Sequence, residues 1–176
     1  MTTKARVVLQ DARQAIFNHS DRLQSEDFRV SWFSIVAMLR AVGHVLDKVD
    51  GESTPHVRRA VDEKWRELTR TKPEPRIFWS FIEHERNRFL KNYEHGIVRT
   101  FTFIGPDHDG QTTVLVEDLS NARGGSSFSE EALFETRISD GPYAGQHERD
   151  VALEAHDWWK SYLDAVDSLA RAYEAV

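Results

Sequence analysis

The chain has 176 residues, 40% of them apolar and including five Trp and ten Phe, so it is long enough to enclose one substantial core. Its net charge of −6 means that the whole molecule repels polyanions, which excludes nonspecific coating of nucleic acid and leaves only a local basic patch for such contacts. The absence of cysteine excludes disulfides, thiolate nucleophiles and Cys-ligated zinc.

Two amphipathic helices are expected in the N-terminal third. Apolar side chains recur every three or four residues in the segment 4–20, and again over a longer stretch from Asp27 to Gly51. The second pattern is typical of a helix packed along its length in a bundle, and its members are Trp32, Ile35, Leu39, Val42, Leu46 and Val49. Gly43 lies beside this stripe, near Arg40, and either close helix packing or a ligand niche would explain it.

Two more helices follow. Thr54 is placed to cap the third, with Pro55 at its first position, and its apolar residues are Val57, Val61, Trp65 and Leu68. The prolines of the linker 71–75 separate it from a fourth helix, which we expect to end at Gly96. The buried face of the fourth helix is predicted to comprise Ile77, Phe78, Phe81, Ile82, Phe89 and Tyr93.

The pattern then changes to residues that favour strands. The segment 96–119 is rich in Val, Ile, Thr and Phe around a turn sequence, GPDHDG, and predicts a β-hairpin. A loop is expected over 121–129, a short helix over 129–135 and a turn over 139–146. From His147 a last helix carries a stripe of Val151, Ala155, Trp158, Tyr162, Val166, Leu169 and Tyr173.

These elements predict a mainly α fold, an up-and-down four- or five-helix bundle with a β-hairpin insertion. We expect one domain over residues 1–176, with the hairpin and its loops forming an excursion at about 97–145. No stretch reaches the roughly 18 uncharged apolar residues that a membrane span requires. A soluble, cytoplasmic protein without membrane attachment is therefore expected.

The fourth predicted helix carries the side chains with the most chemistry. An advance of about 100° per residue places two imidazoles and two cations on one stripe beside the buried face: His84, Arg88, Lys91 and His95. Arg88 and His95 are two turns apart, about 10 Å, so the long guanidinium can approach the end of the helix that carries the imidazole. Arg86 is about half a turn out of register with His95.

This stretch resembles the signature of HEPN domains (higher eukaryotes and prokaryotes nucleotide-binding), helical bundles in which a His follows an Arg after four to six residues. The six residues FLKNYE separate Arg88 from His95. Phe89 follows Arg88, where many members of the family have a polar residue. The pair that has the polar neighbour, Arg86 with Asn87, lies too far from His95.

The resemblance implies a metal-independent endoribonuclease, or an RNA- or nucleotide-binding protein, of a toxin–antitoxin or defence system. Arg88 and His95 would be catalytic, in a site completed across a homodimer, and the partners would be RNA and an antitoxin protein. An imidazole can transfer protons at the ribose 2′-hydroxyl, while a guanidinium offsets the charge that develops at phosphorus. The substrate-binding residues would be His84, Asn87, Lys91 and Asn92.

The charge distribution permits such a partner locally. From Arg76 to Arg99 five Arg or Lys residues stand against three acidic ones, whereas residues 140–176 hold eight acidic and three basic residues. A basic segment on an acidic protein can attract RNA within a short range.

The same residues also have an ordinary structural explanation. Charged stripes on helices are usually solvated faces whose basic residues pair with nearby glutamates, and a His in a last turn is favoured by the helix dipole. The alternative function is therefore a non-catalytic protein–protein interaction module, and the sequence does not decide whether the chain is an enzyme.

Neither a metal nor a cofactor is expected. The side chains with ligand chemistry are His44 with Asp47, Glu85 and His156, but none of them forms the Glu-x-x-His pair of di-iron bundles. Helical register points both histidines away from the apolar stripes. Glu85 falls on the core side of its helix, which predicts a buried salt bridge with Arg40 as its partner.

Overall fold

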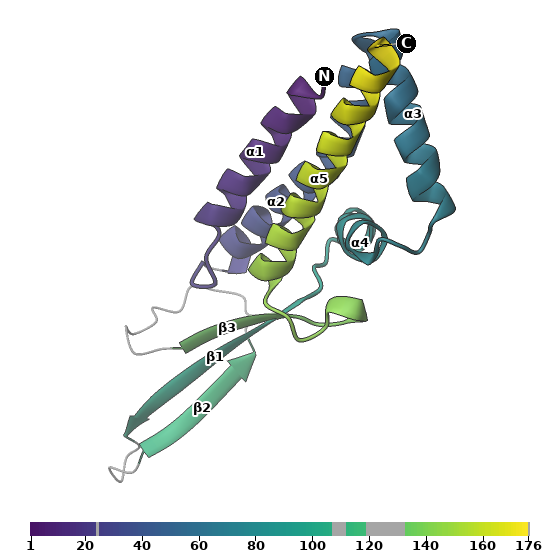
Figure 1. The fold of residues 1–176 in the computed structure, drawn as a ribbon. Helices are drawn as coiled ribbons and strands as arrows, with labels where there is room; N and C mark the ends of the chain where they lie inside the picture. Colours follow the sequence, from purple (N-terminus) through teal and green to yellow (C-terminus); the bar gives the residue numbers. More distant parts are fainter. Residues whose placement is uncertain (24, 107–111, 119–132, 176) are drawn as a thin grey trace.

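The computed structural model describes residues 1–23, 25–106, 112–118 and 133–175. Its α-helices are α1 (Thr3–Asn18), α2 (Ser25–Lys48), α3 (Pro55–Arg70), α4 (Glu83–Asn92) and α5 (Glu148–Glu174), and its strands are β1 (Ile97–Pro106), β2 (Thr112–Asp118) and β3 (Leu133–Ile138). Figure 1 shows α1, α2 and α5 running along one another, α3 beside α5, and α4 seen end-on. The predicted mainly α bundle with a β-hairpin is confirmed.

The core lies between the helices and draws on all of them. Its largest fully buried side chains are aromatic or branched: Trp32, Trp159, Phe28, Phe78, Phe81, Ile16 and Ile35. The segment Ser25–Glu52 is long and apolar enough to cross a membrane by length and composition alone, a test that a core helix of a soluble bundle also passes. In this fold the apolar stripe of α2 is buried in the bundle core from Trp32 to Leu46, which accounts for that composition. Val49 was predicted to belong to the stripe, but it follows the end of the helix and is 50% exposed.

Local signals define the start of α3, whereas a distant carboxylate defines the start of α1. Thr54 Oγ1 accepts a hydrogen bond from the Val57 amide at 3.2 Å, with Pro55 at the first helical position, as predicted. Thr2 provides no side-chain cap for α1. The carboxylate of Asp50, in a short 3₁₀ turn (Asp50–Glu52), instead accepts from the amides of Lys4 at 3.0 Å and Ala5 at 2.8 Å.

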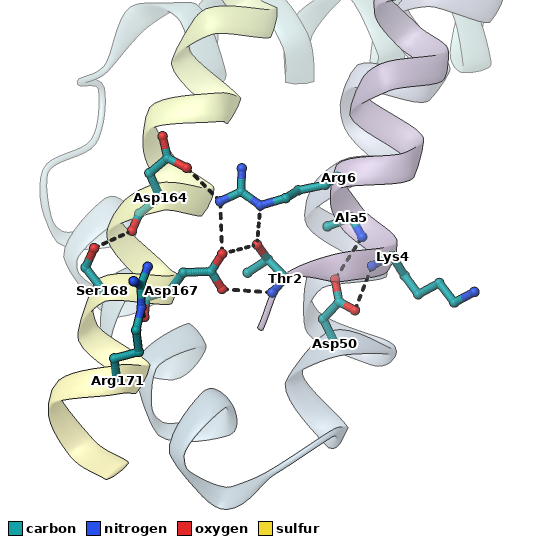
Figure 2. A network of polar contacts seen from close by, with 9 residues as sticks. All are labelled: Thr2, Lys4, Ala5, Arg6, Asp50, Asp164, Asp167, Ser168 and Arg171. Carbon is teal, nitrogen blue, oxygen red and sulfur yellow. Dashed lines mark hydrogen bonds and ion pairs between the residues drawn. The ribbon is translucent and has the colours of Figure 1, made fainter. Parts of the chain in front are cut away.

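A second carboxylate, that of Asp167, connects the N-terminus to α5. Figure 2 shows both Asp50 and Asp167. Asp167 accepts hydrogen bonds from the Thr2 amide at 2.8 Å and the Thr2 hydroxyl at 2.9 Å, and it pairs with Arg6 at 2.9 Å. Burial alone would raise the pKa of the Asp167 carboxyl, but the hydrogen bonds from Arg6 and Thr2 outweigh burial and lower it. The two ends of the chain consequently lie at the same end of the bundle (Figure 1).

The sheet lies beyond the opposite end of the helices (Figure 1), with its antiparallel strands in the order β2–β1–β3. Thr100 lies opposite Asp118 and Pro106 opposite Thr112, which confirms the predicted hairpin. The turn at 107–110 and the loop at 121–129 lie outside the described residues. The short helix predicted over 129–135 is wrong for residues 133–135, which are paired with β1 as the start of β3; the rest of that segment is not described.

The fourth predicted helix has two parts and ends early. A π-helical turn (Ile77–Ile82) leads into α4, and Phe78, Ile82 and Phe89 are buried as predicted. The helix stops at Asn92, not at Gly96, because Tyr93 adopts the left-handed conformation with φ of 57°. Tyr93 was predicted to be buried, but outside the helix it is 63% exposed.

The buried face of α5 is broader than the predicted apolar stripe. Trp159 and Leu163 are at most 1% exposed, whereas Trp158 is only partly buried, because α5 packs against both α1 and α3 and so buries a broad face. His156 is buried as well, which corrects the prediction that it points away from the core. The close packing predicted at Gly43 is confirmed, since a Cβ there would lie 2.8 Å from Cη2 of Trp159.

Candidate functional site

The guanidinium of Arg88 is held by carboxylates. Its Nη2 donates to both carboxylate oxygens of Asp140, at 2.8 and 2.6 Å, and its Nη1 lies 3.4 Å from Glu85 Oε1. Nη2 also lies 3.1 Å from His84 Nε2. The buried salt bridge predicted for Glu85 therefore exists, but its partner is Arg88 and not Arg40, because Arg88 lies one turn further along the same helix. The positive charge of Arg88 is offset on two sides.

Gly96 lets this ion pair pack against the backbone. The Gly96 amide donates to Glu85 Oε2 at 3.0 Å. A Cβ on Gly96 would lie 2.0 Å from Nη1 of Arg88 and 2.6 Å from Oε1 of Glu85. The Arg88–Glu85 ion pair thus lies against the backbone next to His95. There it connects α4 to the start of β1, through Glu85 and Gly96, and to the loop that holds Asp140, through Arg88.

His95 lies beyond the end of α4, so the helical spacing that aligned it with Arg88 does not apply. The half-buried imidazole packs edge-on against Phe28, with ring centroids 5.8 Å apart, and its Nδ1 accepts from the Ile97 amide at 3.3 Å. Burial lowers the pKa of His95, and the positive charges of Arg99 and Arg29 lower it further. The neutral imidazole is therefore favoured.

The other predicted substrate-binding residues do not gather around this pair. His84 is exposed, and its Nε2 lies 3.1 Å from Arg88 Nη2. Asn87 is half-buried and accepts from Arg86 Nη1 at 2.9 Å, while Lys91 and Asn92 are exposed at the end of α4. The geometry brings together Arg88, His84, Glu85 and Asp140, and it leaves the remaining residues spread around the helix.

The candidate metal ligands are also separated. His44 is exposed, as predicted, and the carboxylate of Asp47 is bound by Arg58 at 2.8 Å. His156 lies 2.9 Å from its neighbour Asp157. Within the described ranges, no three His, Asp or Glu side chains are grouped so that they could hold a metal ion.

Two arginines that the sequence reasoning did not assign to a site border adjoining cavities. Arg40 and His44 of α2 line both a cavity of about 210 Å³ against α3 and α5 and a more open one of about 330 Å³ against α4, where Arg86 also lies. The sequence signal for this place was Gly43, for which a ligand niche was one of two explanations.

A buried acidic group forms a further cluster at the start of α5. Glu148 is 0% exposed, His19 Nε2 lies 3.6 Å from its Oε1, and His147 Nδ1 lies 3.3 Å from its Oε2. Burial alone would raise the pKa of Glu148, but His19, Thr136 and His147 outweigh burial and lower it. This cluster joins α1, β3 and α5.

Comparisons with family models, curated proteins and solved structures find no match to this chain. The function is therefore inferred from the geometry of the chain itself.

Proposed function

We propose that the chain is a non-catalytic protein–protein interaction module. The observation that carries this proposal is the bidentate hold of Asp140 on Arg88, together with the buried carboxylate of Glu85 on its other side. A guanidinium that stabilises a transition state must direct its charge at the developing oxyanion. Here two carboxylates already receive that charge, so the residue fits a structural role better than a catalytic one.

The sheet supports an interaction role. Its hairpin extends away from the helices (Figure 1), and β2 and β3 are the outer strands of the described sheet. An outer strand can add a strand from a partner through backbone hydrogen bonds. A protein partner, with a second copy of the chain as one candidate, is therefore proposed in a cytoplasmic setting.

A HEPN-like ribonuclease or RNA-binding protein of a toxin–antitoxin or defence system is the second candidate, with an antitoxin protein as a partner. One observation favours it, namely the lowered pKa of His95, because a neutral imidazole can accept a proton at neutral pH. This function would require RNA or a second protomer to displace Asp140 from Arg88.

RNA degradation in EDTA separates the two candidates. Wild type, Arg88→Ala and His95→Ala should all leave RNA intact, as should Arg70→Ala, a control for an exposed cation at the end of α3. Arg88→Ala should instead lower the free energy of unfolding by about 2 kcal/mol, because it leaves the buried Glu85 carboxylate without its cation.

Asp140→Asn provides the sharpest comparison, because it removes one of the two carboxylate charges beside Arg88 and keeps the guanidinium. Under the proposed function this variant leaves RNA intact and is only less stable. Cleavage by wild type that increases in Asp140→Asn, and that is lost in folded Arg88→Ala and His95→Ala, would establish the ribonuclease instead.

A further inference from the structure

Two adjoining cavities share a wall on α2. The first, about 210 Å³, has an aromatic floor formed by Trp65, Trp159 and Tyr162. The second, about 330 Å³, lies between α2 and α4 and is bordered by Phe33, Leu90 and Arg86. The first cavity is also lined by the ion-paired Asp47, Arg58 and Asp62, whereas the ionisable side chains of the more open second cavity are all basic. The two cavities meet at Arg40 and His44, which line both.

The arginines at this junction carry uncompensated charge. Among the described residues, neither Arg40 nor Arg86 has a carboxylate oxygen within 4.0 Å. The guanidinium of Arg40 lies over the Phe78 ring at 5.9 Å, and Arg86 contacts the neutral amide of Asn87 at 2.9 Å. Arg58, on the same first cavity, is by contrast paired at 2.8 Å with Asp47 and 2.6 Å with Asp62. The free positive charge is therefore confined to the side facing α4.

Trp159, on the wall of the first cavity, packs closely against α2. Trp159 is 1% exposed, and its indole Nε1 has no acceptor among the described residues. Gly43 allows the indole to approach α2, because a Cβ there would lie 2.8 Å from Trp159 Cη2 and 3.6 Å from Arg40 Nη1.

We propose that these two cavities bind one small amphipathic anion. Its ring lies on Trp65, Trp159 and Tyr162, and its carboxylate or phosphate lies between Arg40, His44 and Arg86. A dry cavity of about 150 Å³ is sufficient for a benzene ring, so the first cavity, about 210 Å³, holds a single ring rather than a larger body. Guanidinium groups bind both anions through paired, charge-assisted hydrogen bonds.

The negative charge of the whole molecule does not oppose this site. The net charge is −6, but charges beyond about 8 Å are largely screened at physiological ionic strength. The nearby carboxylates of Asp47 and Asp62 are paired with Arg58, so the unpaired arginines supply the free positive charge at the junction. This site is independent of the proposed protein-interaction function, because it uses neither Arg88 nor the sheet.

Calorimetric titration with four probes tests the assignment at physiological ionic strength. Phenyl phosphate or benzoate should bind at least about tenfold more tightly than phenol and inorganic phosphate, because only the aromatic anions engage both cavities. Tighter binding of phenyl phosphate would identify the anionic group of the ligand as a phosphate monoester, and tighter binding of benzoate would identify it as a carboxylate. Equal affinity would show that the site recognises the negative charge and not the kind of anion. Phenol or inorganic phosphate binding as tightly as both aromatic anions, or no binding by any probe, overturns the proposal.

Variants locate the site. Arg40→Gln and Arg86→Gln should each weaken binding of the better probe at least about tenfold, whereas Arg40→Lys should retain most of it. Arg13→Gln is the matched control, because Arg13 is exposed on α1 and also lacks a carboxylate within 4.0 Å in the described chain. Circular dichroism verifies the folding of each variant. Equal affinities in folded Arg86→Gln and Arg13→Gln overturn the assignment even if Arg40→Gln does not fold.

Discussion

At the scale of single residues, the buried carboxylate of Glu148 links stability to pH. It is the first residue of α5, where the helix dipole favours negative charge, and its oxygens face the imidazoles of His19 and His147. The pKa of Glu148 is lowered in the folded protein. Its contribution to stability is therefore complete above its unfolded pKa, near 4.5, and is lost as the pH falls through the lower folded value.

Replacing Glu148 by Gln tests this link. Urea unfolding at neutral pH should show a loss of about 2 kcal/mol, and the loss should shrink as the pH falls below about 4.5, where the wild-type carboxylate also takes up a proton. Glu26→Gln, at an exposed position in the first turn of α2, should change little. An acid dependence in Glu148→Gln as steep as that of wild type would remove Glu148 as its source.

His95 adds a second pH effect of the same sign. Its folded pKa is lowered by burial and by Arg99 and Arg29, so the unfolded chain takes up the proton more readily. Stability should consequently begin to fall below the unfolded pKa of about 6.5. His95→Gln should flatten the pH dependence of the free energy of unfolding between about pH 5 and 6.5, and a slope unchanged from wild type would contradict this assignment.

At the scale of elements, α1 depends on a carboxylate from another part of the chain. Asp50 caps the amides of Lys4 and Ala5, and it does so from the short turn that follows α2 (Figure 2). Because Asp50 is only 4% exposed, water cannot readily replace it as an acceptor. The packing of α1 against α2 is thus stabilised by this cap as well as by the apolar core.

Asp50→Ala should lower the free energy of unfolding by about 1–2 kcal/mol, because two amides at the start of α1 lose their acceptor. Hydrogen exchange should accelerate at the amides of Lys4 and Ala5 before it does in α3. Asp11→Ala, at an exposed position on α1, is the control. Unchanged exchange at those two amides would show that the cap is dispensable.

At the scale of the whole molecule, the proposed self-association can be tested at two exposed apolar side chains. Val30 of α2 is 58% exposed and Tyr93, just after α4, is 63% exposed. Arg29 lies over the Tyr93 ring at 5.4 Å, which places these two segments side by side. Burying such side chains against a second copy would contribute about 1.5–3 kcal/mol each.

Light scattering across a concentration series should therefore show a dimer. Val30→Asp and Tyr93→Asp should each weaken dimerisation at least about tenfold. Val7→Asp, at a 51% exposed position on α1, should not. A wild-type protein that stays monomeric at every concentration would exclude this face and weaken any mechanism that needs two copies.

The sequence by itself determined the features that depend on neighbouring residues. The stripe of α2, the Thr54 cap with Pro55 and the β1–β2 hairpin follow from periodicity, capping and β propensity, and all three are present. The mainly α class of the fold follows from the same local rules.

Only the tertiary structure decided which charges are used and which remain free. Tyr93 ends α4 before His95, so helical register no longer relates His95 to Arg88. Asp140, 52 residues away in the chain, binds Arg88, while no carboxylate of the described chain reaches Arg40. Spacing along one helix cannot predict such pairs, because the partner of a charge is set by the segment that folding brings beside it.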